Sequence, residues 1–150
     1  MKRSAYILPL FFGAIGCTAG DVQDYELLLS NLNAGNVLRF DGHSGNRLPD
    51  AVSADNVPEH IRPRGFRPSS TVAMDDRLIV ANFDDGQLLE FYEDGRFSRV
   101  FSRTADETVH LEEPCAITRG QDAFFVLHND TSNVAQLHRD GSLLDTLGAS

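Results

Sequence analysis

The amino-acid sequence predicts an all-β fold, and three observations support this prediction. Residues 68–95 align without a gap on residues 114–141, 46 positions later, so the chain repeats a unit. Each unit consists of short apolar or alternating runs separated by turns rich in Gly, Asp and Asn, which is typical of strands and hairpins. No apolar period of 3.6 residues continues beyond the first twenty residues, so no amphipathic helix is expected there.

In the middle unit we expect four strands, at residues 70–74, 77–82, 87–92 and 96–101. The second run, Leu78-Ile79-Val80-Ala81, is apolar at every position, which predicts a strand covered on both faces. The third and fourth runs alternate apolar and polar residues, which predicts strands nearer the outside. Four strands in a unit of 40 to 50 residues are typical of propeller blades. The sequence therefore predicts a partial β-propeller of about three four-stranded blades.

The three copies of the unit span residues 25–66, 67–112 and 113–148. The first copy aligns on the second at an offset of 51 and lacks its innermost strand, because four residues separate Gly20 from the strand beginning near Tyr25. Closed propellers usually have 4 to 8 blades, so we expect an incomplete ring. Three explanations remain open: the chain is a shortened propeller, which we favour, two complete chains close a ring as a homodimer, or the half-ring docks on another protein.

The residues that recur between copies resemble a known group of propellers. In residues 31–45, NLNAGNVLRFDGHSG, and 78–95, LIVANFDDGQLLEFYEDG, a Gly-containing turn after Asn leads into a strand ending near Phe and then an Asp-containing turn. This pattern resembles bacterial propellers related to NHL repeats, TolB-like domains and the virginiamycin B lyase-like group. The resemblance covers residues 25 to about 148 and implies the fold. It does not specify an activity, because the shared positions are structural.

The first sixteen residues are typical of a secretory signal peptide. Lys2 and Arg3 precede an apolar run at residues 5–15, which small residues follow. This run of about eleven residues is shorter than the roughly 20 needed to span a bilayer as a helix. We therefore expect residues 1–16 to be removed.

Residues 14–17, Ala-Ile-Gly-Cys, resemble the bacterial lipobox. The resemblance implies cleavage before Cys17 and acylation of that cysteine, with residues 17–24 as a short tether. Each buried acyl methylene contributes about 0.8 kcal/mol, so several chains give stable anchoring. Thr18 then favours the outer membrane, with the protein facing the periplasm or the exterior. The alternative is an ordinary cleaved signal peptide in which Cys17 has no special role.

The charge and the cysteines limit the partners and the chemistry. The chain has 13 basic and 22 acidic residues, and its formal net charge of −9 argues against binding nucleic acid, or anionic lipid through side chains. All basic residues except Lys2 are arginine, a bias that we attribute to codon usage. Cys115 has no cysteine partner once Cys17 is lipidated, so we expect it to be a small core residue. A nucleophilic role would need a nearby histidine such as His110.

The connections at residues 52–67 and 102–113 are the expected binding loops, because propeller loops gather at the ends of the central channel. The binding candidates they contain are Glu59, His60, Arg64, His110, Glu112 and Glu113. A divalent metal could use His60, His110 and Glu112, but the close ligand spacing of a motif such as HExxH is missing. We therefore expect no catalytic residue, metal or cofactor.

Acidic turns elsewhere in the repeat are explained by turn chemistry rather than by calcium binding. The residues concerned are Asn33, Asp84, Asp85, Asn129 and Asp130, which lack the spaced carboxylates of a calcium loop. Asn31 and Asn82 occupy the position of His128 in the third copy, so this position is expected to be structural.

Two functions are consistent with the sequence. The first is a non-enzymatic envelope lipoprotein, anchored to the membrane by lipid, whose propeller is a binding or scaffolding surface for a protein or a small molecule. The alternative is a metal-dependent hydrolase or lyase of the lactonase or virginiamycin B lyase-like type, which would use a divalent metal in the central channel.

Overall fold

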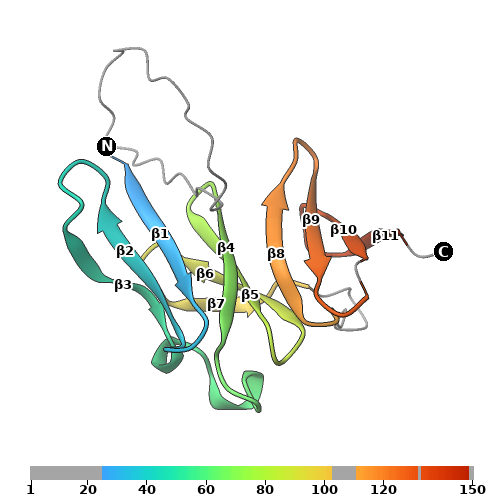
Figure 1. The fold of residues 1–150 in the computed structure, drawn as a ribbon, viewed down its shortest axis with the longest axis horizontal. Helices are drawn as coiled ribbons and strands as arrows, with labels where there is room; N and C mark the ends of the chain where they lie inside the picture. Colours follow the sequence, from blue (N-terminus) through green and yellow to red (C-terminus); the bar gives the residue numbers. More distant parts are fainter. Residues whose placement is uncertain (1–24, 103–110, 132, 149–150) are drawn as a thin grey trace.

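The computed structural model describes residues 25–102, 111–131 and 133–148. Their regular structure consists of eleven strands and two short 3-10 turns, η1 (Ala54–Asn56) and η2 (Glu59–Ile61). The strands form three antiparallel sheets that stand side by side (Figure 1). The prediction of an all-β chain with about three propeller-like sheets is confirmed.

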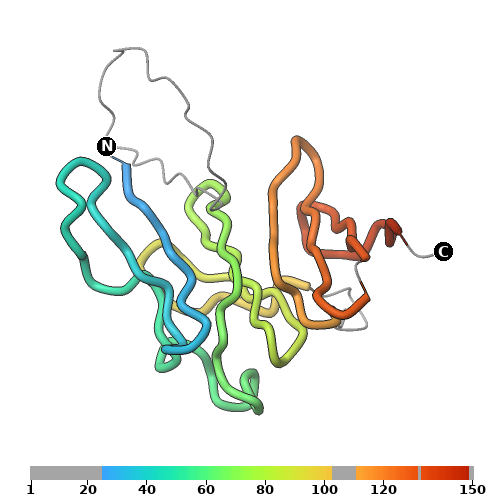
Figure 2. Tube along the Cα trace, in the orientation of Figure 1, coloured from blue at the N-terminus to red at the C-terminus, as the bar shows by residue number. Residues whose placement is uncertain are grey.

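Each sheet is built from strands in sequence order. Sheet 1 contains β1 (Glu26–Asn31), β2 (Asn36–Asp41) and β3 (Arg47–Ser53). Sheet 2 contains β4 (Pro68–Met74), β5 (Arg77–Asn82), β6 (Gln87–Tyr92) and β7 (Phe97–Val100). Sheet 3 contains β8 (Pro114–Arg119), β9 (Ala123–His128), β10 (Val134–His138) and β11 (Leu143–Leu147). The chain path in Figure 2 places β4 between β1 and β8, so these three strands face the centre of the arrangement.

Sheet 2 is covered on both faces, as the apolar run at its centre predicts. Leu78 and Val80 of β5 point toward sheet 1, whereas Ile79 and Ala81 point toward sheet 3. All four side chains are at most 5% exposed. Neighbouring residues of one strand therefore belong to two different hydrophobic cores, because strand side chains alternate between faces.

The two cores have similar compositions. Core 1, between sheets 1 and 2, contains Leu28, Val37, Ala51, Val52, Val57, Phe66, Leu78, Val80, Leu89 and Phe91. Core 2, between sheets 2 and 3, contains Ile79, Ala81, Leu88, Phe101, Leu111, Ile117, Phe124, Val126, Ala135 and Leu137. Edge-to-face aromatic pairs occur in both, with ring centroids 6.1 Å apart for Phe66 and Phe91 and 5.3 Å apart for Phe101 and Phe124.

Strands β6 and β7 are the outer strands of sheet 2, as predicted, but the alternating sequence of β6 does not indicate how fully the strand is buried. Leu88, Leu89, Glu90 and Phe91 are all buried. The carboxylate of Glu90, 6% exposed, is 3.1 Å from Nε of Arg99 and 3.7 Å from Nε of Arg77, and it accepts a hydrogen bond of 2.7 Å from Oγ of Ser98. The polar position is therefore compatible with a buried strand because its charge is paired.

Several arginines make specific contacts within the fold. The guanidinium of Arg77 lies 4.1 Å from the ring centroid of Tyr92, and Nη1 of Arg67 donates to both carboxylate oxygens of Asp84 at 2.8 and 3.0 Å. Stacking on an aromatic face suits the planar guanidinium better than an ammonium group, whereas the contact with Asp84 uses one nitrogen and is a simple ion pair.

Turn glycines allow neighbouring sheets to touch through their backbones. Gly95, in the turn between β6 and β7, has φ +85°, and a Cβ at this position would lie 2.5 Å from the carbonyl oxygen of Ala51 in sheet 1. At Gly35, between β1 and β2, a Cβ would lie 2.7 Å from the carbonyl oxygen of Phe66. A side chain at either position would push a turn away from the backbone it contacts.

Gly95→Ala should therefore reduce the free energy of unfolding more than Gly45→Ala. Both glycines have positive φ, so both substitutions carry about 1 to 2 kcal/mol of backbone strain. Only Gly95 also meets neighbouring backbone, because nothing lies within 4 Å of a Cβ built at Gly45. We expect a loss on the order of 3 kcal/mol for Gly95→Ala, measured by urea unfolding. Equal losses for the two variants would contradict the backbone contact.

Candidate functional site

A cleft of ≈ 670 Å³ lies where the turn between β5 and β6 meets the connection leading into β8. We call it the loop cleft. It is lined by Pro63, Arg64, Asp84, Asp85, Gly86, Gln87, Leu111, Glu112, Glu113 and Asp130. Five of these side chains are carboxylates and one is a guanidinium, so the lining is strongly acidic.

One wall of the loop cleft is held in place by Asn82, at the end of β5. Its Oδ1 accepts a hydrogen bond of 2.8 Å from the backbone N–H of Arg67, and its Nδ2 donates to Oδ2 of Asp85 at 3.0 Å. The backbone N–H of Arg64 donates to Oδ1 of Asp85 at 3.2 Å. The β5–β6 turn is thus tied to the long connection that precedes β4.

The guanidinium groups near this wall are partly used within the protein. Nη1 of Arg64 donates to the carbonyl oxygen of Asp84 at 3.0 Å, while the Asp84 carboxylate is paired with Arg67. Asp84 is therefore neutralised by its own neighbour. The remaining carboxylates of the cleft keep their negative charge without an arginine partner among the described residues.

The opposite wall comes from sheet 3 and the residues just before it. The backbone N–H of Leu111 donates to the carbonyl oxygen of Gly86 at 2.8 Å, and Nδ2 of Asn129 donates to Oε2 of Glu113 at 3.1 Å. Glu113 has φ +45°, a backbone conformation that is uncommon for a residue with a side chain. Glu112 is exposed, and no hydrogen bond to its carboxylate comes from the described part of the chain.

The hydrogen-bonding capacity left in the loop cleft belongs to acceptors. Oε1 of Gln87 is buried and has no hydrogen-bond partner in the segments that the structure describes. It adds to the carboxylates of Glu112 and Asp130. Asp130 accepts a hydrogen bond of 3.4 Å from Nδ2 of Asn129 at one of its two carboxylate oxygens. An acidic surface that still has free acceptor oxygens suits a ligand that carries donors and positive charge, such as an ammonium or guanidinium group.

The structure brings together three of the six predicted binding residues, Arg64, Glu112 and Glu113. Glu59 and His60 lie in η2, are exposed and do not line the cleft. His110 lies outside the described residues. Within residues 25–102, 111–131 and 133–148, no three His, Cys, Asp or Glu side chains are close enough to share a metal ion.

Sequence reasoning missed the acidic turns and Gln87 as parts of this site. Asp85 has the predicted turn role, through Asn82, but it also lines the loop cleft together with Asp84 and Asp130. The position of these turns in the repeat could have indicated that they belong to the site. Turns that follow the second strand of each unit lie at the same end of the sheets as the connections between units, so their side chains can share one cleft with loop residues.

Cys115 is half-buried and belongs to neither core, so the prediction of a core position is wrong. Its Sγ donates a weak hydrogen bond to the carbonyl oxygen of Leu127 at 3.4 Å. The pairing of β8 with β9 shifts register between Pro114 and Ala116. At this bulge Cys115 departs from the burial that is usual for a free cysteine, on which the prediction relied.

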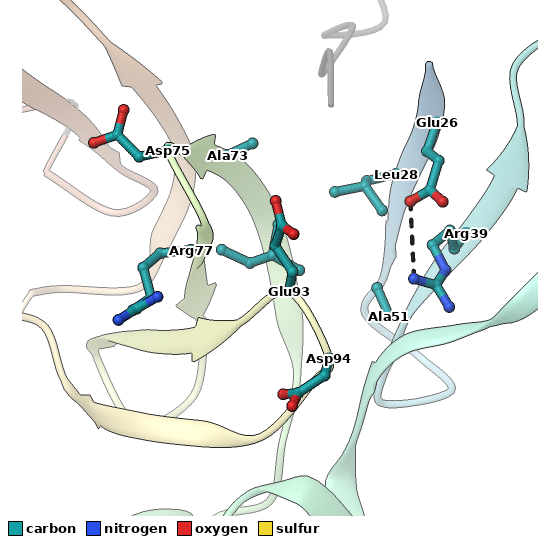
Figure 3. Close-up of a pocket in the computed structure, with 10 residues that line it drawn as sticks. Glu26, Leu28, Arg39, Ala51, Ala73, Asp75, Arg77, Glu93 and Asp94 are labelled. Carbon is teal, nitrogen blue, oxygen red and sulfur yellow. Dashed lines mark ion pairs between the residues drawn. The ribbon is translucent and has the colours of Figure 1, made fainter. Parts of the chain in front are cut away.

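A second hollow, the intersheet pocket, lies between sheets 1 and 2 at the other end of sheet 2 and measures ≈ 250 Å³ (Figure 3). Glu26 and Arg39 line it from sheet 1, where their charged groups are 3.8 Å apart. Asp75 and Arg77 line it from sheet 2. Four carboxylates and two guanidinium groups line the intersheet pocket, against five and one in the loop cleft, so its preference for cations is weaker.

A third hollow, the central groove, measures ≈ 650 Å³ and runs along β1, β4 and β8. Its lining is mainly apolar, with hydroxyl groups from Ser30, Ser69, Ser70, Thr71 and Thr118. Several hydroxyls bind neighbouring protein groups. The Oγ of Ser30 lies 2.7 Å from Oγ1 of Thr71, and the Oγ of Ser70 accepts from the backbone N–H of Ile117 at 3.2 Å.

Comparison of the chain with protein-family models finds no match, and comparison with curated proteins finds no similar protein. Among the described residues, no helix is long and apolar enough to cross a membrane.

His128, at the position of Asn31 and Asn82 in the other units, is buried beside the loop cleft. Its side chain is 9% exposed, and its Nε2 has no hydrogen-bond partner among the residues described. Burial lowers the pKa of His128 below 6.5, and the nearby charge of Glu112 opposes this effect only in part. The imidazole is therefore neutral in the folded protein at neutral pH.

Acidification should destabilise the protein through His128 at mildly acidic pH. Because its pKa is lower in the folded than in the unfolded chain, the unfolded chain binds the proton first as the pH falls below 6.5. The protein therefore has its full stability with respect to His128 above pH 6.5. It loses stability as the pH falls toward the pKa that His128 has in the folded protein. His128→Asn should flatten the dependence of the unfolding free energy on pH between about 7 and 5, measured by urea unfolding.

The matched control is His138→Asn, which changes an exposed histidine of the same sheet and should retain the wild-type pH dependence. Carboxylates act at lower pH. Hydrogen bonds lower the pKa of four aspartates from 3.8. The donors and acceptors are Ser44 to Asp41, Arg47 to Asp50, Arg96 to Asp94 and Ser142 to Asp140. The stability that these ionised aspartates contribute is therefore lost only below about pH 4. An unchanged profile between about pH 7 and 5 in His128→Asn would show that burial of His128 has no energetic consequence.

Proposed function

We propose that this chain is a non-enzymatic binding module of the cell envelope, tethered by lipid at Cys17, whose loop cleft takes up a cationic group of a protein or small-molecule partner. The observation that carries the binding role is the excess of carboxylates lining the loop cleft, five against one guanidinium, among which the exposed Glu112 accepts no hydrogen bond from a described residue. The three-sheet scaffold supports the cleft by joining a turn of sheet 2 to the segment leading into sheet 3.

The anchoring part of the proposal is supported by the sequence order of basic residues, apolar run and Ala-Ile-Gly-Cys at residues 14–17. The likeness of the repeats to NHL and TolB-like propellers is part of the same proposal. Propellers of this kind present ligand sites at the ends of the sheets, which is where the loop cleft lies. Fold likeness leaves the identity of the ligand open.

Cys17→Ser should release the protein from the membrane fraction. Without the thiol no thioether-linked lipid can form, and the anchoring free energy of about 0.8 kcal/mol per buried methylene is lost. The measurement is metabolic labelling with an alkyne fatty acid, combined with membrane fractionation. Cys115→Ser is the control and should remain labelled and membrane-bound. Continued labelling of Cys17→Ser would refute the anchor.

Glu112→Gln should weaken binding of a fluorescent hexa-arginine peptide by about two- to fivefold, because one exposed ion pair contributes up to about 1 kcal/mol. Adding Asp130→Asn should weaken it further, and wild-type binding should decrease as salt rises. Fluorescence anisotropy measures both effects. Glu112 is the preferred position because its exposed carboxylate accepts no hydrogen bond from another described residue, so the substitution should leave the fold unchanged.

Asp122→Asn is the matched control, since it removes one exposed carboxylate from the turn at the other end of sheet 3. It should bind like the wild type. Equal weakening by Asp122→Asn and Glu112→Gln would mean that the peptide responds to net charge and not to the loop cleft. Turnover of lactones, glycans or cyclic peptides at enzyme-like rates by the full chain would refute the non-enzymatic assignment.

A further inference from the structure

The two outermost sheets each have one face that no described residue covers. The free face of sheet 1 carries Leu27, Leu29, Leu38 and Phe40. The free face of sheet 3 carries Phe125, Leu127, Val134 and Leu147, together with the polar residues Gln136 and Asp145. Leu29 is 42% exposed and Leu127 is 41% exposed, although both lie in central parts of their strands.

The free face of sheet 1 has the same residue positions as a buried face of sheet 2. Leu27 pairs with Phe40, and Leu29 pairs with Leu38. Fifty-one residues later, in sheet 2, Leu78 pairs with Phe91 and Val80 pairs with Leu89. These four residues of sheet 2 form its side of core 1 and are at most 5% exposed.

The free face of sheet 3 corresponds in the same way to the opposite face of sheet 2. Leu127 pairs with Val134, as Ala81 pairs with Leu88 at positions 46 residues earlier. The same offset relates Phe125 to Ile79 and Leu147 to Phe101. Ile79, Ala81, Leu88 and Phe101 form the sheet 2 side of core 2 and are fully buried.

Both free faces therefore keep the apolar residues of an interior sheet interface. In stacked repeats, a face that remains in water is normally polar, because exposed apolar area promotes association. The polar residues on the free face of sheet 3, Gln136 and Asp145, occupy the positions of the paired Glu90 and Arg99 of sheet 2. The chemistry of both free faces is that of surfaces covered by another sheet.

We propose that the free face of sheet 1 of one chain packs against the free face of sheet 3 of a second copy, and the reverse, so that two copies associate head to tail. The two faces correspond to the two halves of the interface seen between neighbouring sheets within one chain. One chain therefore carries both complementary halves. A two-fold arrangement uses each half once per chain, forms the same contact twice and leaves no free face.

The sheet count fits this arrangement. The described residues of one chain form three sheets, so two copies of this part give six, which is within the range of 4 to 8 blades in closed propellers. The central groove would be completed at the same time, because Leu29, Phe125, Leu127 and Val134 of the free faces also line it. This inference rests on the free faces alone and is independent of the ligand proposed for the loop cleft.

The test is sedimentation equilibrium of the full chain in a density-matched neutral detergent. The wild type should have the protein mass of two chains. Leu29→Glu and Leu127→Glu should each raise the dissociation constant by at least about tenfold, because each places a charge in both copies of the contact. Leu143→Glu is the matched control and should remain dimeric. Leu143 is 45% exposed but pairs with the buried Leu137, so it lies on the other face of sheet 3.

Mixing the two variants tests the head-to-tail geometry. A Leu29→Glu chain keeps an intact sheet 3 face and a Leu127→Glu chain keeps an intact sheet 1 face, so the mixture should regain dimers through one unchanged contact. Unfolded variants would not recover in this way. A wild-type chain that stays monomeric at all concentrations would overturn the proposal, and so would a mass that responds to only one of the two substitutions.

Discussion

The structure depends on the burial of β5 from both sides. A strand in a two-layer protein buries alternate residues, whereas here Leu78 and Val80 belong to one hydrophobic core and Ile79 and Ala81 to the other. Neither core can form without sheet 2, since each uses one of its faces. The positions of sheets 1 and 3 follow from how they cover this strand, and the position of sheet 3 against the β5–β6 turn determines the shape of the loop cleft.

Charged groups inside the arrangement are compatible with this burial because they are paired locally. Glu90 is buried in β6 but lies beside Arg77 and Arg99, and Ser98 donates a further hydrogen bond to it. Removing one partner would leave a buried carboxylate short of compensation, which costs more than an exposed pair contributes. The loop cleft differs, because Glu112 and Asp130 face solvent and keep their charge for an external group.

The repeat made much of the fold predictable. Apolar runs and Gly-Asp turns at constant spacing located β5 and β6 to the residue, because both patterns depend on local backbone geometry. The burial of β6 was missed because a glutamate reads as an exposed position until its arginine partners are known. Of the site, sequence indicated Arg64, Glu112 and Glu113, but not Gln87, whose significance is that its amide oxygen is buried without a partner. Cys115 was misplaced because the prediction used the usual burial of free cysteines, whereas this one lies at an irregularity of the β8–β9 pairing.

The glycine contacts between neighbouring sheets determine which features of the repeat can vary during evolution. Gly35 and Gly95 contact the main chain of a neighbouring part of the structure, at the carbonyl groups of Phe66 and Ala51. The spacing between sheets is therefore set by carbonyl groups, which every residue type possesses. Side chains in the cores can then be exchanged for others of similar volume without altering the spacing between sheets. A lineage of such repeats can diverge until little residue identity remains, provided that these few turns stay free of a β-carbon.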